Sequence, residues 1–214
     1  MARISHTQEV STSSNPTKRY LEYKSVKKEF SYYDKDLGKE VDVPLPLKFV
    51  FIQHYHTVKG WHDASNSGIY ANEVFFIGSE PMSVKSFKGG KIAEGIYTDI
   101  KAQVLSAGGK YHKSIYVMLE DGTLANISLK GSSVKEWSDF MEENKNNVDN
   151  NWVEILIATD EKKGSIKYSV PKFTLGDSLT KKESSDADSC AFELKEYLDS
   201  KTTKEEDVPL DLGI

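Results

Sequence analysis

Cysteine is almost absent from this sequence of 214 residues, in which Cys190 is the only one. A single thiol excludes both an intramolecular disulfide and a zinc site built on paired cysteines. Cys190 is followed by Ala191 and Phe192 within a helical pattern. We therefore expect Cys190 to be a small buried side chain rather than a nucleophile.

Long apolar runs and an export signal are missing as well. No stretch approaches the roughly 18 apolar residues of a membrane-spanning helix, and the N-terminal sequence lacks the apolar centre of a secretory signal. A content of 38% hydrophobic and 29% charged residues is typical of a soluble globular domain. We expect a cytoplasmic protein that makes no contact with membranes.

The common enzyme signatures are also lacking. The sequence contains no glycine-rich nucleotide loop, Walker loop, G-x-S-x-G elbow or H-E-x-x-H motif. The nearest approach to a metal site is formed by His54, His56 and His62, because alternate residues of a strand share a face. We expect a protein that is not an enzyme and has no cofactor, and leave open whether these histidines bind a metal.

The composition divides the chain into four parts. Residues 1–17 are rich in Ser, Thr and Asn and are predicted to form a disordered arm. Residues 18–176 carry the strand patterns of one domain. A charged linker with a helix follows at 177–203, and an acidic tail at 204–214.

Alternating apolar and polar residues predict that the domain is mainly β. An N-terminal hairpin turns at 36–38, and a long strand runs over 48–58. A loop over 59–70 then precedes a strand at 70–77. Two strands joined by a Lys-Lys-Gly turn occupy 152–176.

The clearest strand pattern covers residues 92–130, which contain two glycine turns. We expect a three-stranded meander here, with one face in the core and a polar outer face. Tyr97 and Lys101 are predicted to point away from the core. The three strands are expected at 96–104, 113–119 and 123–130.

Two helices are predicted. Ser133-Val134-Lys135-Glu136 has the form of a capping box and opens a helix that runs to about Lys145, with Trp137 on its apolar stripe. A second helix is expected at 189–200.

Charge is unevenly distributed along the chain. The net charge is -5, yet residues 85–135 contain eight lysines against four acids, whereas 183–214 contain ten acids against three lysines. Lysines that follow phosphates and aromatic rings on which bases stack are the two parts of a single-strand binding surface. The same residue types are common on solvated strand faces, which is the alternative reading. The candidate contacts are Lys59, Trp61, Lys88, Lys91, Tyr97, Lys101, Lys110, Tyr111, Lys113, Tyr116 and Lys130.

The order of these elements resembles that of OB-fold single-stranded DNA-binding proteins of the tailed-phage type. The resemblance rests on the strand at 48–58, the meander at 92–130, the helix at 133–145 and the returning strand at 152–158. It implies an OB-like five-stranded barrel with an extra N-terminal hairpin. It also implies an acidic tail that competes with DNA for the basic groove or recruits replication and recombination proteins. The tail residues are Glu205, Glu206, Asp207, Val208, Pro209 and Leu210.

We therefore expect a protein that binds single-stranded DNA with little sequence preference and protects it during replication or recombination. It would act in the cytoplasm, which is that of the host cell if the chain is phage-encoded. Two alternatives stay open: a phage structural or assembly protein that uses its tyrosines for protein contacts, and a hydrolase-like enzyme that uses the three histidines. The sequence determines neither the oligomeric state nor the choice between DNA and RNA.

Overall fold

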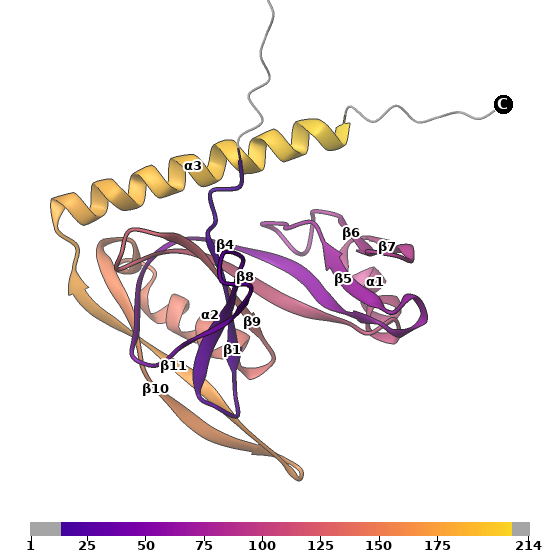
Figure 1. Cartoon of the computed structure of the whole chain (residues 1–214), viewed down its shortest axis with the longest axis horizontal. Coiled ribbons are helices and arrows are strands. Elements are labelled where there is room, and N and C mark those ends of the chain that lie inside the picture. Colours follow the sequence, from indigo (N-terminus) through magenta and orange to yellow (C-terminus); the bar gives the residue numbers. More distant parts are fainter. Residues whose placement is uncertain (1–13, 207–214) are drawn as a thin grey trace, which may run out of the picture.

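A computed structural model describes the backbone of residues 14–206 and the side chains of residues 14–201 (Figure 1). The protein is mainly β, as the sequence predicts, with three α-helices among the described residues. None of the described helices is both long and apolar enough to cross a membrane. Most of the predicted N-terminal arm, residues 1–13, lies outside the described residues.

The strands form one mixed sheet of eleven strands in the described chain. Its main path has the order β3-β2-β1-β9-β8-β4-β5-β6-β7, and off this path β10 pairs with both β4 and β11. β1 runs parallel to β9, and the other pairs are antiparallel. The strands are β1 (Arg19–Lys24), β2 (Glu29–Asp34), β3 (Lys39–Val43), β4 (Leu47–His62), β5 (Ser67–Ala71), β6 (Met82–Ser86), β7 (Gly90–Gly95), β8 (Gly109–Leu119), β9 (Leu124–Lys130), β10 (Asn151–Lys163) and β11 (Ile166–Ser178).

β4 is the strand around which the others are arranged, and it confirms the long strand predicted at 48–58. Its first residues pair with β10, most of its length with β8, and its last residues with β5 (Figure 1). A bulge between Phe51 and Gln53 bends it. One strand therefore belongs to two lobes of the molecule.

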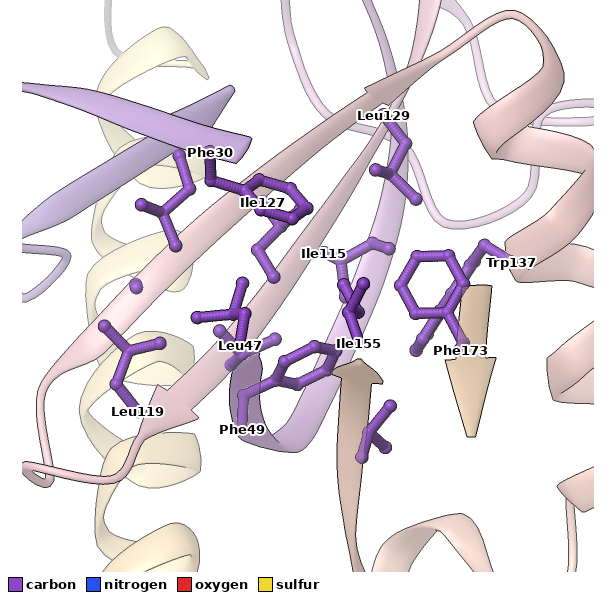
Figure 2. Close-up of a cluster of buried hydrophobic side chains, with 14 of the residues drawn as sticks. Phe30, Leu47, Phe49, Ile115, Leu119, Ile127, Leu129, Trp137, Ile155 and Phe173 are labelled. Carbon is purple, nitrogen blue, oxygen red and sulfur yellow. The ribbon is translucent and has the colours of Figure 1, made fainter. Parts of the chain in front are cut away.

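The first lobe contains the main hydrophobic core. α2 (Ser132–Asn144) packs against β11 and β9, and Trp137 is fully buried, as its place on the apolar stripe predicts. The Trp137 ring lies 5.1 Å from that of Phe173, between centroids, near Ile115 and Leu129 (Figure 2). β1 lies beside β9, and Tyr23 on it contacts Ser169 of β11 with 2.6 Å between the hydroxyl oxygens.

The second lobe is built from β5, β6, β7 and α1 (Tyr97–Ser106), at the far end of β4 and β8 (Figure 1). It has its own core, in which Val58 and Val84 from the sheet meet Ile100 and Val104 from α1. The insertion between β4 and β8 is thus a packed unit rather than a set of loops.

α3 (Lys181–Glu206) lies along the outside of the first lobe (Figure 1). Its residues Ala187, Cys190 and Leu194 are buried against a third cluster that includes Val50 and Trp152. The burial of Cys190 is confirmed, but the helix begins well before the predicted residue 189. The tail residues Glu205 and Glu206 belong to the backbone of α3, whereas Asp207, Val208, Pro209 and Leu210 lie outside the described residues.

The strand predicted at 96–104 is wrong, because this segment is helix α1. Gly95 ends β7 with a φ of 144°, and Ile96 is the N-cap of the helix. Ile96, Ile100 and Val104 lie four residues apart, a spacing that fits one face of a strand as well as one face of a helix. The predicted meander therefore reduces to the β8–β9 hairpin.

Three smaller predictions need correction. Lys59 and Trp61 do not lie in a loop, since β4 continues to His62. The strand predicted at 70–77 ends at Ala71, after which the chain forms turns. The capping box does not form, because Gly131 is the N-cap of α2 and no side chain caps the helix.

Candidate nucleic-acid interface

An open groove of about 620 Å³ lies between α1 and α2. At this point β9 ends, and residues 109–111 of β8 are not paired with it. Four elements line the groove with lysines: Lys101 from α1, Lys110 from β8, Lys130 from β9 and Lys135 from α2. We call this site the lysine groove. The remaining lining residues are Tyr97, Leu105, Tyr111, Gly131 and Val134.

Three of these lysines have no acidic partner among the side chains of residues 14–201. Lys135 is ion-paired with Asp139, one turn further along α2. Within the described part of the chain, Lys101, Lys110 and Lys130 form no ion pair, and all three are exposed. Three positive charges are thus available to an anionic ligand.

Two tyrosines occupy the inner side of the groove. Tyr97 and Tyr111 have ring centroids 5.6 Å apart, and the Tyr111 hydroxyl lies 2.5 Å from Nδ1 of His56. Burial, with a smaller effect of Tyr97, raises the pKa of Tyr111 to about 12, so it is a neutral hydrogen-bonding group at physiological pH. Tyr97 is only 7% exposed, which leaves little of its ring for a ligand to stack on.

The electrostatic effect of the lysines is visible at His112, a buried residue of β8. The pKa of His112 is lowered to about 3, mainly by burial and to a smaller extent by the charges of Lys59, Lys130 and Lys110. His112 therefore stays neutral at physiological pH and shares a hydrogen bond of 3.0 Å with the Ser128 hydroxyl. Three lysines close enough to affect one imidazole make this end of the sheet electropositive.

A second groove of about 530 Å³ adjoins the first, and both are lined by Lys130 and Gly131. We call it the serine groove. It is lined by residues of β1, of the β9–α2 junction and of the β10–β11 hairpin, which contributes Lys163 and Tyr168. Among the described residues, Glu22 is the only acid that lines it. The serine hydroxyls in its wall belong to Ser25, Ser128, Ser132, Ser133 and Ser169.

Five of the predicted contacts thus meet in the lysine groove, namely Tyr97, Lys101, Lys110, Tyr111 and Lys130. Lys113 and Tyr116 do not join them at the surface. Lys113 is buried on the inner face of β8, where burial lowers its pKa, and Tyr116 is covered on the other face, where its hydroxyl donates to Glu73 at 2.7 Å.

The other predicted contacts lie on the second lobe. Lys91 forms an ion pair with Glu94 on β7, and Lys88 is exposed in the turn between β6 and β7. Lys59 and Trp61 lie on one face of β4, opposite Tyr70 and Gly68 of β5. These residues do not line the lysine groove.

The sequence prediction missed Lys135, and with it the part of α2 that forms one wall. Lys135 was assigned to a capping box, whereas the helix actually begins at Ser132, before that motif. The signal that points to Lys135 is its position five residues after the end of β9, close in sequence to Lys130 and Gly131.

The histidines do not gather around one point. His54 and His56 have ring centroids 6.4 Å apart, while His62 lies at the other end of β4 and bonds Ser65 at 2.7 Å. Nδ1 of His54 accepts a hydrogen bond of 3.3 Å from the Trp137 indole. No group of three metal-ligating side chains is found within the described residues.

Comparisons with protein-family models, curated proteins and solved structures find no match. Any assignment of function must come from the site itself.

Proposed function

We propose that this protein binds single-stranded DNA with little sequence preference, and that the lysine groove holds the phosphates. The supporting observation is that Lys101, Lys110 and Lys130, from three separate elements, converge on one open groove and form no ion pair among the residues that the structure describes. Side chains of this kind bind the sugar-phosphate backbone without reading bases. The role is non-enzymatic, and protects exposed strands during replication or recombination.

The strand order supports an OB-like barrel as part of this proposal. β4, β8, β9, α2, β10 and β11 follow one another as the five strands and the helix of such a fold would. OB-folds bind oligonucleotides on the face of strands 2 and 3, between the loop after strand 1 and the loop after strand 4.

The location of the two grooves supports this OB-like assignment. With β4 as strand 1, α1 belongs to the insertion after strand 1 and lines the lysine groove. Lys163 and Tyr168 flank the turn after strand 4 and line the serine groove. β8 and β9, the second and third strands, lie between. The proposed tailed-phage type and the competing acidic tail rest on the sequence resemblance alone.

Fluorescence anisotropy with a labelled oligo-dT at low salt tests the proposed function. We expect saturable binding that weakens steeply as the salt concentration rises. Unlabelled duplex DNA of the same length should be a poor competitor. Binding that is absent at low salt would refute the proposal. Equal competition by the duplex would refute the preference for single strands.

One observation favours the second candidate, a structural or assembly role. Phe75 and Phe76 follow β5 and are 40% and 59% exposed, with ring centroids 4.5 Å apart. An exposed apolar pair of this kind is typical of a protein contact. Replacing both with Ser should abolish a self-association or particle contact in sedimentation, and leave oligo-dT affinity unchanged.

A further inference from the structure

Besides Phe75 and Phe76, three large aromatic side chains are exposed on the second lobe, and they do not line either groove. Trp61 is 53% exposed, Tyr70 40% and Phe87 72%. They come from the end of β4, from β5 and from the residue after β6. A group of exposed aromatic rings on neighbouring strands indicates an interaction surface.

The strand register places these rings on one face. Trp61 is opposite Gly68, and the Phe87 amide donates to the Gly68 carbonyl at 3.1 Å, so the three residues lie in one row across the sheet. Gly68 has no side chain, and the Phe87 ring packs over it, since a Cβ at this position would be 3.2 Å from the ring. The Phe87 ring stacks on Tyr70 with 4.6 Å between centroids.

Lysines form the adjoining row. Lys110 is opposite Lys59, Lys59 is opposite Tyr70, and Tyr70 is opposite Lys85. Directly opposed residues of antiparallel strands share a face, and residues two apart along a strand do too. Lysine and aromatic side chains therefore share this face. The other face is apolar and buried, through Val58, Ile69 and Val84.

Lys110 connects this face to the lysine groove, because it takes part in the row and also lines the groove. Burial lowers the pKa of Lys59, and the charges of Glu22 and Glu73 offset this effect only in part. Neither acid forms an ion pair with Lys59 in the described chain. The face is thus cationic, aromatic and continuous with the proposed phosphate site.

We infer that Trp61, Tyr70 and Phe87 form a stacking platform for unpaired bases of the strand whose phosphates the lysine groove holds. The inference rests on the proposed function and adds the bases to it as ligands. Every base has a π-face, so stacking on such rings is tolerant of sequence, and paired bases inside a duplex cannot reach them. The platform gives the protein its preference for single strands.

Tryptophan fluorescence reports on this platform directly. Of the three tryptophans, Trp61 is 53% exposed, whereas Trp137 is 0% and Trp152 6% exposed. In one titration, the anisotropy of labelled oligo-dT measures binding and the protein emission measures stacking. We expect quenching that saturates together with the anisotropy, and no quenching by an abasic phosphodiester of the same length. Trp61→Phe should remove the quenching, which assigns the signal to this residue.

A substitution pair separates the platform from general surface effects. Phe87→Ala should weaken oligo-dT binding about tenfold, the effect of losing one stacked base, and should leave affinity for the abasic strand unchanged. Tyr33→Ala, at a tyrosine 63% exposed on β2, is the matched control and should change neither. If oligo-dT binds without quenching, or binds Phe87→Ala with the wild-type affinity, the stacking platform is refuted while the proposed function is still supported. No anisotropy change in the wild type would overturn both.

Discussion

The number of phosphates held by the lysine groove can be measured from the salt dependence of binding. Each phosphate neutralised on a single strand contributes about 0.7 to the slope of log affinity against log salt. Replacing Lys101, Lys110 and Lys130 with Gln removes the three groove lysines that form no ion pair in the described part of the chain. The slope should therefore fall by about 2. Between about 50 and about 200 mM salt, the wild type should lose roughly 20-fold more affinity than the variant.

Anisotropy titrations of oligo-dT at several salt concentrations measure this slope. A matched control replaces three other exposed lysines, Lys35, Lys39 and Lys181, which removes the same charge away from the grooves. We expect the control slope to stay within the error of the wild-type slope. If both triple variants lower the slope equally, the effect is one of net charge and the groove is not the phosphate site.

Three further predictions concern the core, the histidines and the tail. Trp137→Ala should lower the free energy of unfolding by about 3 to 5 kcal/mol in urea denaturation, because it empties the centre of the main core; a change below about 1 kcal/mol would contradict that packing. The folded-state pKa is lowered to about 3 for His112 and to about 4 for His54 and His56, below their ordinary value of 6.5. Below about pH 6.5 the unfolded chain therefore binds more protons than the folded chain, and the free energy of unfolding should fall as the pH drops from 6.5 toward 4. His112→Asn should make this fall smaller. A wild-type free energy of unfolding that does not change over this pH range would argue against neutral buried histidines. Deleting residues 204–214 should raise oligo-dT affinity at low salt if the tail competes for the lysine groove, and unchanged affinity would remove that role.

The sequence predicted the part of the fold in which strand periodicity is unambiguous. β4 and the β8–β9 hairpin have long alternating patterns or strong glycine turns, and both were located correctly. α1 was missed because apolar residues four apart satisfy a strand and a helix equally. Only the packing of Ile100 and Val104 against Val58 in the second lobe decides between them.

The candidate site was predicted by residue type but not by arrangement. The strand pattern places Lys101 and Lys130 on one outer face of the meander, whereas the lysine groove forms at the edge where α1 and α2 flank β8 and β9. Tyr116 has the parity expected of an outer residue, but Glu73 and α3 cover that part of the sheet. Burial of this kind depends on segments distant in sequence, which periodicity does not report.

Tyr70 and Phe87 were not predicted as contacts for a related reason. The sequence predicts a strand that begins at Tyr70 but not its pairing with the segment of Phe87, so the register that places both rings beside Trp61 is not apparent from it. Cross-strand neighbours are fixed by pairing, and pairing is a long-range property of the chain.

Lysine footprinting tests the location of the interface most directly. The protein is acetylated with and without saturating oligo-dT at low salt, and modification at each lysine is measured by mass spectrometry. We predict strong protection of Lys101, Lys110 and Lys130, and none of Lys35, Lys39 or Lys181. Protection confined to the second set, or no difference between the two sets, would contradict the assignment of the lysine groove as the nucleic-acid interface.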